Sequence, residues 1–258
     1  MFQTIYKKVF VTLRLSTVVV WAVFGLVSCK KEMREEIYPA SLTIVNAVND
    51  NSSFFSAYFG ETRPKIFNRL AYIKSGDAME YGTNKTTQPV RIFRNYDTMN
   101  FDRPFLQTQV NLEPGGIFTH FIYGSTAKPL QKTIKENLPA RSINDSVVNL
   151  RIINLFDTRP VDVVQIEPVA GTMVSDLAYE QLSDFIKVPA NAAVGSFRFE
   201  VRDHATGVVI ASIAETNILP GTRTPNPQWL FKARTMLVTG SWTGPGNINA
   251  RATTIGHF

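Results

Sequence analysis

The chain has 258 residues, with 27 Lys and Arg against 21 Asp and Glu and a single cysteine. One cysteine excludes a framework of internal disulfides, which needs pairs of thiols. The net charge of +6 comes without the clustered basic stripe that a nucleic-acid surface needs, so we expect no nucleic-acid partner.

The first 28 residues predict an export signal. Lys7, Lys8 and Arg14 precede an apolar run, "LSTVVVWAVFGLV", of about a dozen residues. A membrane-spanning helix needs roughly 20 apolar residues, so this run is too short to be one, whereas a signal peptide has this charge and length pattern. Removing the segment leaves 24 basic and 21 acidic residues, a net charge of +3.

The end of this segment, Leu26-Val27-Ser28-Cys29, resembles the lipobox of bacterial lipoproteins. The resemblance implies that the Cys29 thiol is diacylated, that the signal is cut before it, and that the new amine is acylated. The alternative is a signal peptide with an incidental cysteine. Acyl chains contribute about 0.8 kcal/mol per buried methylene, and two or three chains anchor a protein stably. We therefore expect a lipid anchor in the outer membrane, on the periplasmic face or at the cell surface.

A charged tether, residues 29–38, follows the cysteine and contains "KKEMREE". This segment loosely resembles the surface-export tags of Bacteroidetes lipoproteins.

Beyond the tether, the sequence repeats itself. Four pairs of segments match in the same order: "LTIVN" with "LRIIN", "LAYIKSG" with "LSDFIKVP", "VRIFRN" with "FRFEVRD", and "VNLEPGGIFTHFIYG" with "NILPG…RTMLVTG". We predict two copies of one fold, at residues 39–142 and 143–258.

The repeated segments are short, rich in β-branched and aromatic residues, and bounded by Gly, Pro, Asn and Asp, which is typical of strands. The best helical candidate, residues 173–186, has apolar positions only partly in phase. Strands at this spacing, in units of about 110 residues, predict an all-β protein of two tandem antiparallel Ig-like β-sandwich domains.

The pattern hydrophobic-x-hydrophobic-hydrophobic-Asn, followed by polar residues and "VDV", resembles the DUF4397 family of secreted bacterial Ig-like modules. Residues 150–168 and 185–203 carry the pattern best, and "LEPGGIFT" (112–119) is similar to the family's later motif. The first copy is more divergent, with Phe54-Phe55 where "VDV" is expected. The resemblance supports the sandwich fold, and the family brings no catalytic residues to this chain.

The residue types of common catalytic sites are too scattered to predict an enzyme. The three histidines, His120, His204 and His257, lie far apart, and none has metal-ligand spacing with another. No G-x-S-x-G elbow is present, although a Ser-His-Asp triad without a motif stays open. Two of the 21 acids could meet as a glycosidase pair, but the sequence gives no pair an environment that would raise a carboxyl pKa. The segment "NDNSS" (49–53) lacks calcium-loop spacing. We expect no catalytic residue, metal or cofactor.

An insert in the second copy is the candidate binding region. Residues 221–234 separate two expected strands that only "PGG" joins in the first copy. The insert combines an aromatic ring with positive charge, and such residues dominate binding energies where a site exists. The candidate ligand-binding residues are Arg223, Trp229, Lys232 and Arg234, with Trp242 of the "GSWTGPG" segment expected nearby. The alternative is that Trp229 caps the core.

These features predict a non-enzymatic, lipid-anchored envelope protein that serves as a surface binding or adhesion module. Its partners would be the membrane, through the lipid on Cys29, and a glycan or another envelope protein. The alternatives are a pilin-like structural subunit, or a glycan-binding accessory of an outer-membrane uptake system.

Overall fold

The computed structural model describes residues 38–50, 54–63, 71–94, 101–141, 145–191, 193–216, 218, 229–244 and 247–257. The signal, Cys29 and most of the tether belong to a separate unit, Met1–Ile37, which lies outside these residues, whereas Tyr38–Phe258 form one compact unit. Within the described residues, none of the elements is a helix of the length and apolar character needed to span a bilayer.

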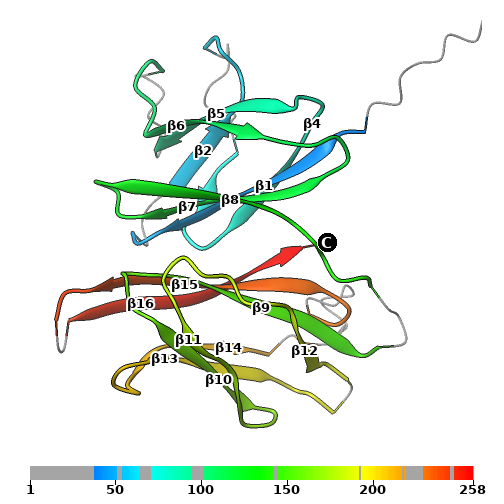
Figure 1. Ribbon diagram of the computed structural model, residues 1–258, viewed down its shortest axis with the longest axis vertical. Coiled ribbons are helices and arrows are strands. Elements are labelled where there is room, and N and C mark those ends of the chain that lie inside the picture. Colours follow the sequence, from blue (N-terminus) through cyan, green and yellow to red (C-terminus); the bar gives the residue numbers. More distant parts are fainter. Residues whose placement is uncertain are drawn as a thin grey trace, which may run out of the picture. The chain divides into compact units, whose positions relative to one another are not determined.

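The described chain consists of strands, shown in Figure 1. The first half contains β1 (Ala40–Val48), β2 (Phe54–Tyr58), β3 (Ile73–Lys74), β4 (Ala78–Thr83), β5 (Thr87–Arg94), β6 (Leu106–Asn111), β7 (Ile117–Gly124) and β8 (Pro129–Lys135). The second half contains β9 (Val147–Phe156), β10 (Val161–Glu167), β11 (Gly171–Leu177), β12 (Ile186–Pro189), β13 (Phe197–Asp203), β14 (Val209–Glu215), β15 (Ala233–Trp242) and β16 (Ile248–His257).

The two halves have the same strand topology. The first has sheets of order β4-β1-β7-β8 and β3-β2-β5-β6, and the second has β12-β9-β15-β16 and β11-β10-β13-β14. Adding eight to each strand number of the first half gives the second. The prediction of an all-β chain with two sandwiches is confirmed. The strands pair antiparallel except for β1 with β7 and β9 with β15, which are parallel.

One of the four sequence matches pairs the wrong strands. It equates Ile73 with Ile186, but Ile73 lies in β3 beside β2, whereas Ile186 lies in β12 beside β9. The structural counterpart of Ile73 is Leu177, because the carbonyl of each accepts a hydrogen bond from the asparagine of the repeated motif. The helical candidate 173–186 contains the end of β11, a turn and the first residue of β12.

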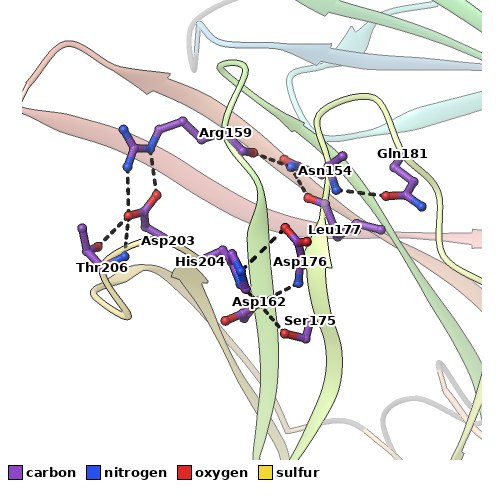
Figure 2. Close-up of polar contacts among 11 residues, drawn as sticks. Asn154, Arg159, Asp162, Ser175, Asp176, Leu177, Gln181, Asp203, His204 and Thr206 are labelled. Carbon is purple, nitrogen blue, oxygen red and sulfur yellow. Dashed lines mark hydrogen bonds and ion pairs between the residues drawn. The ribbon is translucent and has the colours of Figure 1, made fainter.

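The motif asparagines have a structural role. Asn154 donates from Nδ2 to the carbonyls of Arg159 (2.7 Å) and Leu177 (2.8 Å), as Figure 2 shows. Its Oδ1 accepts from the Phe156 amide (3.0 Å). Asn46 is fully buried as well and donates to the Ile73 carbonyl at 3.1 Å. Buried backbone groups need such partners, so each asparagine stabilises the point where the chain leaves the central strand.

Each sandwich has its own apolar core. In the second sandwich, alternate residues of β9 point inward and meet β10, β13 and β15. Its members include Leu150, Ile152, Phe197, Phe199 and Met236. The first sandwich packs Leu42, Ile44, Phe55, Ile92 and Ile122 in the same way.

A third apolar cluster joins the two sandwiches. It consists of Val45, Ala47, Phe121, Tyr123, Ile153, Leu155, Leu237 and Ile255, from the opposite faces of β1, β7, β9 and β15 and from β16. These central strands are therefore buried on both faces, which explains their nearly continuous apolar sequences. The two sandwiches form one packed body through this interface.

Candidate functional site

The predicted binding insert lies mostly outside the described residues, Arg223 included, and its described part begins at Trp229. Trp229 is 1% exposed and belongs to the core of the second sandwich. Its ring centroid lies 5.1 Å from that of Phe197 and 6.4 Å from that of Phe199. The ring is therefore part of the core, as the alternative interpretation expected, and it presents no face to a ligand.

Arg234 is also used in packing. Its guanidinium carbon lies 4.6 Å from the centroid of the Trp229 ring, and Nη2 donates to Thr254 Oγ1 at 2.8 Å. Burial lowers the pKa of Arg234 below its ordinary value, because a charged group loses solvation there. Arg234 stabilises the tryptophan and the neighbouring strand β16, so its contacts are structural.

Trp242 lies at the opposite end of β15 from the insert. The strand has ten residues, and at about 3.3 Å per residue its ends are roughly 30 Å apart. For the described part of the insert, residues 229–234, the expectation that it forms one binding end with "GSWTGPG" is therefore wrong. Trp242 is half-buried, and the guanidinium carbon of Arg159 lies 4.3 Å from the centroid of its ring. Arg159 also donates two hydrogen bonds to the carboxylate of Asp203, at 2.7 and 3.0 Å.

Phe231, two residues after Trp229, contributes to a small pocket at the beginning of β15. This pocket has a volume of about 210 Å³. It is lined by four parts of the chain: the segment that joins the two sandwiches, the beginning of β9, strand β12 and the turn before β15. The lining residues are Pro139, Ala140, Arg141, Asp145, Val147, Asn149, Lys187 and Phe231. We call it the Phe231 pocket.

Backbone pairing places these side chains together. Asn149 of β9 lies opposite Lys187 of β12 on one side, and its amide bonds to the Lys232 carbonyl at 2.9 Å on the other. Asn149 shares a face of β9 with Arg151 because side chains alternate along a strand. The Phe231 pocket therefore lies on the face of the sheet that contacts the first sandwich, and its Asn149 comes two residues before Arg151 in β9.

Phe231 itself has an unusual backbone conformation. Its φ is +60°, and it occupies the third position of a turn closed by a 3.0 Å bond from the Lys232 amide to the Trp229 carbonyl. Glycine is favoured at such positions, and a bulky residue in this region costs about 1–3 kcal/mol. The amide of Phe231 donates to the Val147 carbonyl at 2.9 Å, which fixes the half-buried ring beside β9.

The charged residues of the Phe231 pocket are accessible to solvent. Lys187 Nζ lies 2.7 Å from Asp145 Oδ2, but the two side chains are 66% and 37% exposed. An ion pair this exposed contributes little to stability and exchanges easily with other partners. Arg141 is exposed, and no hydrogen bond or ion pair connects it to another residue of the described ranges.

A larger apolar cleft of about 580 Å³ lies on the other side of β12. The β10–β11 hairpin and the segment after β12 line it, and Val169 at the hairpin tip is 73% exposed. Its lining is mostly aliphatic and contains no aromatic ring among the described residues. Lys187 borders both this cleft and the Phe231 pocket, so the two concavities flank β12 at the same end of the sandwich.

A polar cluster on the second sandwich surrounds Asp162 (Figure 2). Asp162 Oδ1 accepts from the Asp176 amide (2.8 Å) and Ser175 Oγ (3.0 Å), and it lies 2.8 Å from His204 Nδ1. Partial burial alone would raise the pKa of Asp162, but these hydrogen bonds bring it below its ordinary value, while the bond to Asp162 raises the pKa of His204. Ser175 donates to the carboxylate and not to the imidazole, so the histidine is not placed to activate it as in a catalytic triad.

The other two histidines are buried. His120 Nδ1 lies 2.8 Å from Thr133 Oγ1, and His257 Nε2 lies 2.6 Å from Thr235 Oγ1. Burial lowers the pKa of each to about 4. Within the described ranges, no group of three or more His, Cys, Asp or Glu residues is arranged to hold a metal ion.

Comparison with known proteins gives little further information. No family model matches the sequence, and no curated protein matches it. Among solved structures, a family 41 carbohydrate-binding module from streptococcal virulence factors, described as recognising α-glucan, matches with 9% identity and a TM-score of 0.26, covering 83% of this chain and 96% of that chain. A TM-score this low establishes no shared fold, so the ligand of that module is not carried over to this chain.

Of the aromatic residues in the described part of the insert, Trp229 belongs to the core and Phe231 lines the pocket. Trp229 and Phe231 are two positions apart, and only the fold distinguishes the core ring from the pocket ring. Arg141, Asp145 and Lys187 come from three other segments and have no signal of their own. Lys232 lies next to the Phe231 pocket, where its backbone pairs with Asn149.

Proposed function

We propose that this protein is a non-catalytic binding module, attached to the outer membrane by acyl chains on Cys29. Its binding face is the end of the second sandwich at which β9 and β15 begin. The ligand would be a glycan or another component of the cell envelope.

The observation that carries this proposal is the Phe231 pocket. It combines an aromatic wall, an amide and charges of both signs, which is the composition of a recognition site with a few convergent polar groups. The strained backbone of Phe231 adds support, since strained residues are concentrated at functional sites. The pocket also adjoins the insert by which the second repeat differs most from the first.

A binding role fits the chemistry of this face better than catalysis does. Asp145 is paired with Lys187 and lies in a solvent-exposed part of the pocket. The residues here favour hydrogen bonding and charge recognition, which hold a ligand without changing it.

The fusion of the two sandwiches is consistent with a protein that presents its binding face from a membrane surface. Cluster residues such as Val45 and Leu237 join the two repeats, so the binding face is fixed relative to the beginning of β1, where the tether enters. A rigid support for exposed binding residues is a common arrangement in β-sandwich proteins.

The membrane anchor is tested in cells that express the full-length chain. Metabolic labelling with palmitate is expected to mark the wild-type protein and not the Cys29→Ser variant, which should also leave the membrane fraction. Labelling that is the same for both proteins would overturn the anchoring proposal.

The binding face is tested separately with detergent-extracted full-length protein on an array of glycans and envelope proteins. Phe231→Ala is expected to abolish a signal that Tyr38→Ala, an exposed aromatic in the first half, leaves intact. Equal signals from the two variants would place the binding face elsewhere.

A further inference from the structure

We infer that the Phe231 pocket recognises a sugar bearing a carboxylate, such as a uronic acid within an acidic polysaccharide. This inference rests on the proposed function and specifies its ligand. It depends on the size, the ring and the charges of the pocket.

The size of the pocket indicates a single small unit. Its volume is about 210 Å³, below the range of about 300–1,000 Å³ that accommodates drug-sized ligands. One sugar ring at a chain end or side branch is a ligand of this class. The larger cleft beyond β12 is too apolar for the hydroxyl groups of such a ring, because unpaired polar groups are costly to bury there.

The ring of Phe231 supplies the aromatic wall of a pocket that is lined by both apolar and polar side chains. The face of a benzene ring is electron-rich, and the C–H groups of a sugar ring carry slight positive charge, so the two surfaces attract each other. The turn from Trp229 to Lys232 fixes this ring from behind, since Trp229 is anchored in the core. The wall is therefore preorganised before a ligand arrives.

The charges of the pocket favour an anion with hydroxyl groups over a neutral sugar. Arg141 and Lys187 outnumber Asp145, which leaves an excess of one positive charge in the lining. An exposed guanidinium binds a carboxylate through two parallel hydrogen bonds. Asp145 accepts hydrogen bonds from hydroxyls, and Asn149 both donates and accepts. A uronic acid presents one carboxylate and several hydroxyls on the same ring.

The ion pair between Lys187 and Asp145 does not compete strongly with such a ligand. Both side chains are well exposed, and pairs of this kind are nearly neutral in free energy. A ligand carboxylate can therefore bind Lys187, and the hydroxyls of the sugar ring can replace Lys187 as the partners of Asp145.

The test compares acidic and neutral forms of one oligosaccharide. Detergent-extracted full-length protein is titrated calorimetrically with oligogalacturonate, with its methyl ester and with the corresponding neutral galactan. The acid is expected to bind about tenfold more tightly than the ester, and this preference should shrink as salt rises. The double variant Arg141→Gln with Lys187→Gln removes both cations of the lining and is expected to reduce the preference to about onefold, while Phe231→Ala weakens acid and ester alike.

Two controls keep the result interpretable. Arg103→Gln removes an exposed arginine of the first sandwich and should change nothing. Phe231→Gly removes the ring at a position where glycine is favoured, so it should lose binding while remaining folded.

Several outcomes would overturn the inference. Equal affinity for acid and ester, or an acid preference that survives the loss of both Arg141 and Lys187, excludes carboxylate recognition in this pocket but leaves the binding module in place. Binding to acidic peptides and to none of the three sugars would assign the pocket to a protein partner. Failure to bind any ligand on the array, with the palmitate result intact, would instead count against the proposed binding face.

Discussion

Arg151 of β9 contacts Glu136, the residue after β8, with 2.6 Å between Nη2 and Oε1, and this ion pair joins the two sandwiches. The side chains are 5% and 0% exposed. Arg151 also donates from Nε to Thr235 Oγ1 at 2.9 Å, and its guanidinium carbon lies 4.6 Å from the centroid of the Phe185 ring. The pair therefore lies within a polar network beside the apolar cluster that fuses the repeats.

Removing one partner of this pair should destabilise the whole described unit. Glu136→Ala leaves the Arg151 charge buried without its carboxylate, which costs about 3–5 kcal/mol. Urea denaturation followed by tryptophan fluorescence measures the loss. A change below about 1 kcal/mol, the range typical of surface pairs, would contradict the burial of the contact.

The double variant Glu136→Leu with Arg151→Met provides the matched control. It removes both charges together, and well-packed apolar replacements of buried pairs are often neutral or stabilising. The second carboxylate oxygen of Glu136 makes no hydrogen bond to the described residues, so its loss should cost little. We expect the double variant to recover most of the stability that Glu136→Ala loses.

Stability should fall as the pH drops from about 6.5 to about 4. The folded-state pKa of His120 and His257 is about 4, against an ordinary value of 6.5, because burial disfavours the charged form. Between these values the unfolded chain binds more protons than the folded one, so acid favours unfolding. Each histidine contributes up to about 3 kcal/mol over this range.

Hydrogen bonding at His257 supports the neutral form. Thr235 Oγ1 accepts from Arg151 Nε and therefore has its single hydrogen available for His257 Nε2. Chemical denaturation of the wild type at several pH values measures the slope, and His257→Gln and His120→Gln should each flatten it. The same slope in these variants and the wild type would show that other groups cause it.

Asn154 should be among the least replaceable polar residues. It bonds to two carbonyls and one amide where the chain leaves β9, and it is fully buried. Asn154→Leu leaves these backbone groups without partners, and each costs about 1–3 kcal/mol. We expect a loss of about 3 kcal/mol or more, measured by thermal denaturation. Asn154→Asp should be no better, since a carboxylate cannot donate to carbonyls.

Much of the fold could be predicted because its outer strands obey simple alternation. In β13, the inward residues Phe197, Phe199 and Val201 are all fully buried, and the outward residue Arg198 is exposed. The central strands were harder to interpret from the sequence, because they are buried on both faces. In β9, Ile152 enters the sandwich core while its neighbour Ile153 enters the interface. Continuous apolar runs do not reveal what covers the second face, so the fusion of the repeats was not predicted.

The pocket was harder to predict than the strands. Its residues come from segments that only the pairing of β9 with β12 and β15 brings together. Trp229 lies among Pro and Asn in the sequence, which is typical of a loop, but its burial depends on Phe197 and Phe199 in another strand. The spacing of residues in the sequence does not predict that contact.

Truncating Trp229 and Phe231 should therefore have opposite consequences. Trp229→Ala removes a ring that is fully buried among Phe197 and Phe199, and large-to-small changes of this kind cost about 3–5 kcal/mol. Phe231→Gly removes a half-buried ring from a strained turn, where the relief of about 1–2 kcal/mol offsets the lost packing. Thermal melting of both variants compares the effects directly. If the Phe231→Gly protein is as unstable as the Trp229→Ala protein, Phe231 also belongs to the core. That result would contradict the proposal that the Phe231 pocket is a binding site.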